Sequence, residues 1–231
     1  MLYPDDRNIH RPLHLYLDNE IYFVSCRTVN KEKYFRGNLK SLITSSLKLT
    51  KDKYNFELFS WVVLDNHYHL LLEPSKGKDI GKIIRFINGR SARLLLKQCN
   101  RGGDTPSGGD TPSRCVMVKS SIMEDNTITQ PEAVSAPRRN FNPNRHFVWE
   151  QYFDRCIRNE KDFYTHFNYI HHNPIKHGLV KNWEELLSYP FCSYKDWLIK
   201  IGEEAMADIL KMYPIIDFST WRNAPSRRVT I

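Results

Sequence analysis

The chain has 231 residues, of which 41% are hydrophobic and 13% aromatic, so it can bury a core and does not have the composition of a disordered protein. It carries 34 Lys and Arg against 26 Asp and Glu, and this net charge of +8 favours a polyanionic partner such as nucleic acid or an anionic membrane surface. No apolar run approaches the roughly 20 residues that cross a bilayer, which excludes a membrane-spanning helix.

The first part of the chain predicts three strands and, between the first two, one helix. Glu20–Thr28 is rich in β-branched and aromatic residues and predicts a strand. Leucines at helical spacing predict a helix over Arg36–Thr50. Phe56–Leu64 predicts a second strand, and its continuous apolar stretch indicates burial on both faces. Asp65-Asn66 predicts a tight turn into a third strand, His67–Glu73, because Asx residues tolerate the backbone angles of a two-residue hairpin.

A basic amphipathic helix is expected next, over about Lys78–Gln98. Its isoleucines and leucines form one stripe, and its basic residues lie largely off that stripe. Gly89 in its middle disfavours one unbroken helix by about 1 kcal/mol relative to Ala. The basic residues are candidates for contacts with a phosphate backbone, with a solvated helix face as the alternative. Those we single out are Lys82, Arg85 and Arg93.

Residues 100–145 differ in composition and contain the sequence Gly-Gly-Asp-Thr-Pro-Ser twice in tandem, which predicts a disordered insertion. Order is expected to resume with a fourth strand at Glu150–Ile157. A helix capped by Asn159 should run to about Asn173, because Pro174 disfavours helical geometry in the residue before it.

The elements run β-α-β-β-α-β-α and end in a C-terminal helical tail. This order predicts an α+β, ferredoxin-like antiparallel sheet with both crossover helices on one face, leaving the other face free for a ligand. We expect residues 1–99 to be the first part of this domain, 100–145 the insertion, 146–180 the second part and 181–231 the tail.

The five cysteines are scattered without a Cys-x-x-Cys pair, which suits neither a disulfide framework nor a zinc knuckle. The amino terminus lacks the apolar core of a signal peptide. Both features lead us to expect a cytoplasmic protein that makes no membrane contact.

His67 and His69 stand two residues apart on the predicted third strand, so they project from one face while Tyr68 projects from the other. Two imidazoles one strand-step apart can hold one divalent cation. The alternative is that they are two half-exposed polar residues at the start of a strand.

The helix that begins after Asn159 has a polar stripe beside its core-facing one. Tyr169 and Asn173 are an i,i+4 pair on this stripe, below His166, and present a phenol that can attack and an amide oxygen that can ligate. The alternative is a boundary aromatic followed by a helix terminator. The core-facing stripe comprises Phe163, Phe167 and Ile170.

Three longer segments and one short one resemble the REP-associated tyrosine transposases, which belong to the single-tyrosine HUH transposases. They are WVVLDNHYHLLLEP (Trp61–Pro74), VWEQYFDRCIRN (Val148–Asn159), YIHHNPIKHGLV (Tyr169–Val180) and YPFCSY (Tyr189–Tyr194). The similarity spans nearly the whole chain except the insertion, in the same order. It implies a ferredoxin-like core and an enzyme that acts on DNA.

The resemblance also implies roles for individual residues. His67 and His69 align with the two metal-binding histidines, Tyr169 with the nucleophile and Asn173 with the third metal ligand. The metal would be Mg²⁺ or Mn²⁺, which stabilises charge on the scissile phosphate. Lys176 and His177, just past the nucleophile, are further candidates for holding DNA.

The implied reaction cleaves and rejoins single-stranded DNA or imperfect DNA hairpins through a covalent 5′-phosphotyrosine, using a protein that is a monomer or a homodimer. Two alternatives stay open. One is a domesticated or inactive descendant that binds DNA hairpins without cutting them. The other is an unrelated metal-dependent hydrolase that uses the histidine pair, for which the sequence supplies no third strong ligand.

Overall fold

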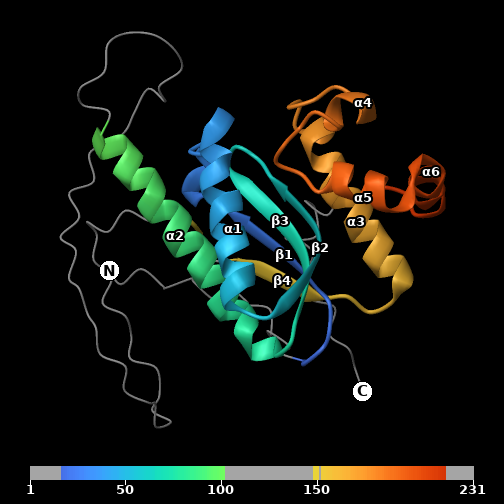
Figure 1. Cartoon of the computed structure of the whole chain (residues 1–231), viewed down its shortest axis with the longest axis horizontal. Helices are drawn as coiled ribbons and strands as arrows, with labels where there is room; N and C mark the ends of the chain where they lie inside the picture. Colours follow the sequence, from blue (N-terminus) through green and yellow to red (C-terminus); the bar gives the residue numbers. More distant parts are fainter. Residues whose placement is uncertain (1–16, 102–147, 151, 217–231) are drawn as a thin grey trace, which may run out of the picture.

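The computed structural model describes residues 17–101, 148–150 and 152–216, so the predicted insertion lies outside them except for its first two residues. In this part of the chain, a four-stranded antiparallel sheet has the order β2-β3-β1-β4 (Figure 1). The strands are β1 (Tyr22–Arg27), β2 (Phe56–Val63), β3 (His67–Pro74) and β4 (Phe153–Cys156). This arrangement confirms the predicted α+β, ferredoxin-like fold.

The two crossover helices, α1 (Ser41–Lys53) and α2 (Ile80–Arg101), pack on one face of the sheet, as the sequence predicts. Alternate strand residues such as Tyr22 and Tyr68 join the helices in one buried cluster. Gly89 lies on the exposed side of α2 and does not interrupt it, because the packing of the apolar stripe of this helix outweighs a cost of about 1 kcal/mol. Short 3-10 turns precede these helices or follow β1: η1 (Val29–Lys31), η2 (Gly37–Lys40) and η3 (Gly77–Asp79).

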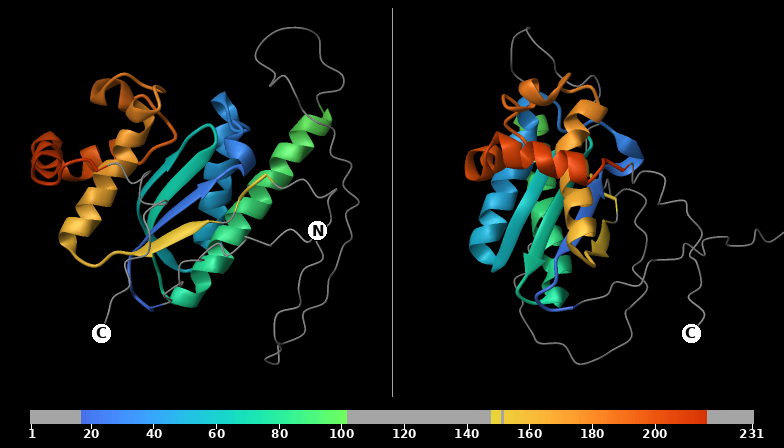
Figure 2. Two further views of the ribbon diagram at one scale, coloured as in Figure 1. Left: turned by 180° about the vertical axis from the view of Figure 1, so that it is seen from behind. Right: turned by 90° about the vertical axis from the view of Figure 1, so that its right-hand side faces the viewer.

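The opposite face of the sheet is not free, which corrects the sequence-based expectation. Figure 2 shows the remaining helices on that side: α3 (Glu160–Lys176), α4 (Trp183–Leu186), α5 (Tyr194–Ile201) and α6 (Glu203–Met212). The sheet is apolar on this side too, and Phe23, Val62 and Leu71 form a second buried cluster with Phe167 and Ile170 of α3. A sheet with two apolar faces must cover both of them.

Helix α3 begins as predicted, since the Asn159 side chain accepts a hydrogen bond from the backbone N–H of Asp162. Its end differs from the prediction, because the helix continues through Pro174 to Lys176. A proline in the last turn removes only one N–H donor, and the Pro174 carbonyl still accepts from the Leu179 N–H. The residue after the C-cap His177 is Gly178, whose φ of 66° is one that glycine adopts without strain and that ends the helical path.

The β2–β3 turn forms at Asp65-Asn66 as predicted, closed by the Leu64 N–H donating to the His67 carbonyl at 2.8 Å. The expected reason is wrong, since neither Asp65 nor Asn66 adopts a positive φ. The Asp65 carboxylate instead pairs with the almost fully buried ammonium of Lys40 at 2.6 Å. Tertiary contacts therefore hold this turn in place.

Three of the cysteines, Cys26, Cys156 and Cys192, form no disulfide bond. Among the residues that the structure describes, no helix has the length and apolarity needed to traverse a membrane.

Candidate functional site

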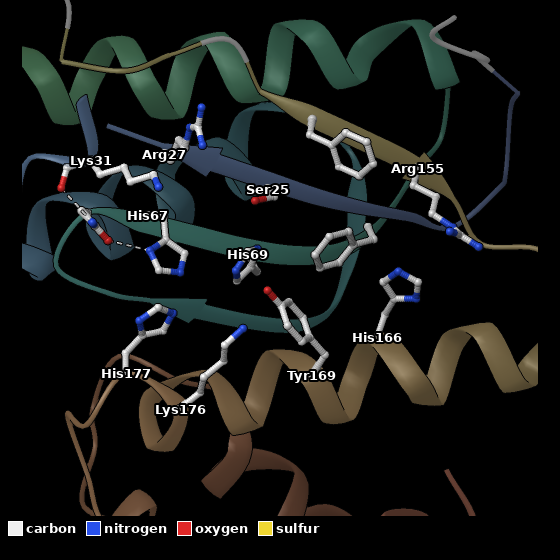
Figure 3. A pocket seen from close by; sticks show the side chains of 13 residues that line it. Ser25, Arg27, Lys31, His67, His69, Arg155, His166, Tyr169, Lys176 and His177 are labelled. Atoms are coloured by element: carbon white, nitrogen blue, oxygen red, sulfur yellow. Dashed lines mark hydrogen bonds between the residues drawn. The ribbon is translucent and has the colours of Figure 1, made fainter. Parts of the chain in front are cut away.

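A cavity of about 260 Å³ lies between α3 and the part of the sheet that α3 leaves uncovered (Figure 3). Its described lining is basic and aromatic and includes no acidic side chain. The lining residues are Phe23, Ser25, Arg27, Lys31, Asn66, His67, His69, Phe153, Arg155, His166, Tyr169, Lys176 and His177. A cavity with this lining suits an anionic ligand.

Strand β3 presents both predicted histidines to this cavity. His69 is 4% exposed and His67 is half-buried, and their ring centroids are 5.0 Å apart. Tyr68 points to the other face, where it is fully buried and its hydroxyl donates to Asn88 Oδ1 of α2 at 2.7 Å. The predicted alternation along the strand is therefore confirmed.

Helix α3 brings Tyr169 to the histidine pair. The Tyr169 ring is 6% exposed, and its centroid lies 5.3 Å from that of His69. In Figure 3 the phenol oxygen points from the helix towards His69 and the sheet. Two segments about a hundred residues apart in the sequence thus bring the predicted nucleophile and the two predicted metal-binding histidines to one cavity.

Asn173 is placed differently from the other three predicted catalytic and metal-binding residues. It does not line the cavity, and it is fully buried in α3 with its Nδ2 donating to the Tyr169 carbonyl at 2.6 Å. Its Oδ1 is buried and accepts no hydrogen bond from any described residue. An amide oxygen in this state retains its capacity to act as a ligand.

The three predicted metal ligands are two imidazoles and one amide oxygen, a set that suits a hard or borderline divalent cation. In the described residues, no three His, Cys, Asp or Glu side chains come together in a group that could hold a metal ion. A zinc site of the usual three or four strong ligands is therefore not formed by these residues.

The predicted DNA-contacting residues divide between two faces of the molecule. Lys176 and His177 line the cavity, with the Lys176 ammonium 5.5 Å from the centroid of the Tyr169 ring. Lys82, Arg85 and Arg93 are exposed on α2, across the sheet from the cavity. A positive charge at this position attracts an anionic group that enters the cavity beside the phenol.

Three cavity cations were not identified from the sequence: Arg27, Lys31 and Arg155. Arg27 lies directly across the β1–β3 ladder from His67, and Arg155 pairs with the Asp162 carboxylate at 3.3 Å. Strand register could have revealed Arg27 and Arg155, because neither of these two lies in a basic run of the sequence.

His166 closes the end of the cavity near Arg155 (Figure 3). It is 1% exposed, and its Nδ1 lies 2.8 Å from the Asp162 carbonyl oxygen, a group that only accepts hydrogen bonds. Burial lowers the pKa of this histidine, against the opposing effect of Asp162. We expect His166 to be neutral near pH 7.

Residues 18–109 match the family model of the IS200-like transposases. A curated protein of Haemophilus influenzae described as a REP-associated tyrosine transposase is 24% identical over 176 residues, which cover 75% of this chain and 79% of that protein. The solved structure of a REP-associated tyrosine transposase bound to a REP hairpin aligns with a TM-score of 0.54 at 19% identity, covering 89% of this chain and 92% of that one. The chain is therefore similar to the IS200-like transposases over residues 18–109 and to a curated REP-associated tyrosine transposase over most of its length, and it shares the fold of a solved member of that group.

Proposed function

We propose that this protein is a DNA transposase that cleaves and rejoins single-stranded or hairpin DNA, with Tyr169 as the nucleophile. The observation that carries the proposal is the position of the Tyr169 ring, 5.3 Å from the His69 ring, in a cavity lined by Lys and Arg and by no described acidic side chain. The similarity to IS200-like and REP-associated tyrosine transposases supports an enzyme that acts on DNA.

In the proposed reaction the Tyr169 oxygen attacks the scissile phosphorus and forms a new P–O bond. The bond from phosphorus to the 3′ oxygen of the preceding nucleotide breaks, and that oxygen takes up a proton as it leaves as a 3′-OH. The phenol proton passes to solvent. The DNA on the downstream side stays attached as a 5′-phosphotyrosine, so the bond energy is conserved for attack by another 3′-OH and rejoining.

His67 and His69 are the residues that would hold Mg²⁺ or Mn²⁺, with the unpartnered Oδ1 of Asn173 as the third proposed ligand. The ion would supply Lewis-acid stabilisation of charge on the phosphate oxygens. Lys176, whose ammonium lies beside the Tyr169 ring, would support the same developing charge from the helix side.

The burial of Tyr169 favours an unpaired strand as the substrate. At 6% exposure its phenol can be reached only by a phosphate that enters the cavity. A duplex that brought its backbone to this depth would have to separate its strands locally, whereas an unpaired strand or a distorted hairpin enters without that cost. The solved structure of a REP-associated tyrosine transposase is likewise bound to a REP hairpin.

The test is a covalent-adduct assay with Mg²⁺ or Mn²⁺ and oligonucleotides taken from the DNA that flanks the gene. We expect an adduct that survives denaturation, forms on single strands and hairpins but not on a perfect duplex, and disappears in Tyr169→Phe. Tyr164→Phe is the matched control, because Tyr164 lies on the same helix but stacks on Tyr213 outside the cavity.

Two results would count against the proposal. An adduct that persists in Tyr169→Phe would exclude this residue as the nucleophile. DNA binding without any metal-dependent adduct in the wild-type protein would instead indicate a hairpin-binding protein that does not cleave.

A further inference from the structure

Asn66 lies between the backbone of η1 and the ring of His67. Its Oδ1 lies 2.7 Å from His67 Nδ1, and its Nδ2 donates to the Lys31 carbonyl at 2.9 Å. Its own carbonyl accepts from the Thr28 N–H at 2.8 Å, which ties the residue to the end of β1. Asn66 thus bridges the β2–β3 turn and the loop after β1, and both segments line the cavity.

The two side-chain contacts determine where the proton sits on His67. A backbone carbonyl only accepts hydrogen bonds, so the amide edge facing Lys31 must be the NH₂ group. The Asn66 atom that faces His67 is therefore the amide oxygen Oδ1, which also only accepts hydrogen bonds. His67 Nδ1 must then carry a hydrogen, and the lone pair of the neutral ring is on Nε2, at the side of the ring turned away from Asn66 (Figure 3).

The backbone that presents the Lys31 carbonyl is held in a costly conformation. Asn30 and Lys31 have φ values of 55° and 58°, two consecutive non-glycine residues in the left-handed region. The left-handed region is sterically unfavourable for residues with a side chain, and Asn is better suited to it than Lys. Strain of this kind persists where the surroundings fix it and is concentrated at functional sites. Here it aims one carbonyl at Asn66 and brings Lys31 to the cavity.

We propose that Asn66 is a positioning residue that fixes His67 as the Nδ1–H tautomer, so that Nε2 is the atom offered to a divalent cation. Free neutral imidazole in histidine favours the opposite tautomer, so the protein must supply this preference. The tautomer of His67 does not depend on the proposed function. The assignment of a divalent cation as the ligand of Nε2 does rest on the proposed function.

The test uses the metal-free protein and long-range ¹H–¹⁵N correlation spectra of its histidine rings, at a pH well above the ordinary imidazole pKa of about 6.5. The His67 signals are assigned by their loss in His67→Ala. We expect the wild type to show a protonated Nδ1 and a lone pair on Nε2. Asn66→Ala should shift His67 towards the Nε2–H form, and Asn66→Asp, which keeps an acceptor facing the ring, should retain Nδ1–H.

Asn55→Ala is the matched control, because Asn55 is an exposed asparagine at the far end of the same β2–β3 hairpin and its side chain makes no hydrogen bond with a described residue. It should leave the His67 tautomer unchanged. An Nε2–H tautomer in the wild type, or an unchanged tautomer in a folded Asn66→Ala protein, would overturn the proposal.

A second measurement separates this proposal from the proposed function. Mn²⁺ alone is titrated into each variant by calorimetry, and Asn66→Ala should bind it about 10–100-fold more weakly than the wild type and Asn55→Ala, the usual cost of losing a residue that orients a ligand. Absence of Mn²⁺ binding in the wild type, with the tautomer as expected, would contradict the metal assignment and leave the positioning of His67 standing. Equal affinities despite a changed tautomer would contradict the link between Asn66 and the cation.

Discussion

Tyr68 is the middle residue of the His67-Tyr68-His69 triplet, and the structure predicts that its hydroxyl contributes to stability without taking part in the site. The hydroxyl is fully buried and donates to Asn88 Oδ1 at 2.7 Å, on the side of the sheet away from the cavity. Burial raises the pKa of this phenol well above its ordinary value, so the group is neutral. We therefore expect Tyr68→Phe to fold with the same ring packing and to lose one hydrogen bond.

The loss can be estimated from the two partners. A net hydrogen bond contributes about 0.5–1.5 kcal/mol, and an acceptor left unsatisfied adds to that cost. Asn88 is only half-buried, so water can replace part of the lost contact, and we expect a total of about 1–2 kcal/mol. For a chain of this size that corresponds to a fall of roughly 2–8 °C in the thermal midpoint.

The assay is thermal or urea unfolding of Tyr68→Phe beside Tyr164→Phe, whose hydroxyl donates to no described residue and whose change should stay within about 0.5 kcal/mol. Adduct formation, measured well below the unfolding midpoint, should be unaffected in both variants. A Tyr68→Phe protein with normal stability and no adduct would refute the assignment of this side chain to the core.

Two further predictions address the cavity cations and the packing of α3. Lys176→Gln should weaken binding of a single-stranded oligonucleotide and reduce the slope of log K against log salt by about 1. Lys82→Gln is the control, because Lys82 lies on α2 and pairs with Asp79, and it should change neither the affinity nor the slope. Salt titrations by fluorescence anisotropy measure both quantities, and a larger effect of Lys82→Gln than of Lys176→Gln would show that DNA lies along α2. Burial lowers the pKa of His171 to about 3. As the pH falls below about 6.5, this histidine therefore becomes protonated in the unfolded chain before it does in the folded protein, and the free energy of unfolding should decrease between about pH 6.5 and about pH 3. His171→Gln should flatten the dependence of the unfolding midpoint on pH in that window, and an unchanged slope would show that His171 does not contribute to it.

Those parts of the fold that depend on local periodicity were predictable from the sequence. The alternation along β3 placed His67 and His69 on one face and Tyr68 on the other, and the cap at Asn159 fixed the start of α3. These predictions succeed because backbone geometry alone decides which way neighbouring side chains point. The end of α3 was predicted one turn too early, because Pro174 weighs less in a last turn than inside a helix.

Contacts made across the sheet were not predictable from the sequence. Arg27 and Arg155 reach the cavity only because β1 pairs with both β3 and β4, and the β4 partner is more than 120 residues away along the chain. The approach of Tyr169 to His69 depends on how α3 packs over Phe23, a tertiary contact that no local pattern contains. The resemblance to a family predicted that Tyr169 and His69 share one site, whereas residue spacing alone did not predict it.

The measurement that tests the central claim most directly is the identification of the residue and the DNA end that become joined. Oligonucleotides labelled at either end are incubated with the protein and Mg²⁺ or Mn²⁺, and the adduct is digested and examined by mass spectrometry. The account predicts that the 3′-labelled fragment stays with the protein, attached through its 5′ phosphate to Tyr169, while the 5′-labelled fragment is released with a 3′-OH. Attachment at another residue, or retention of the 5′-labelled fragment, would contradict it.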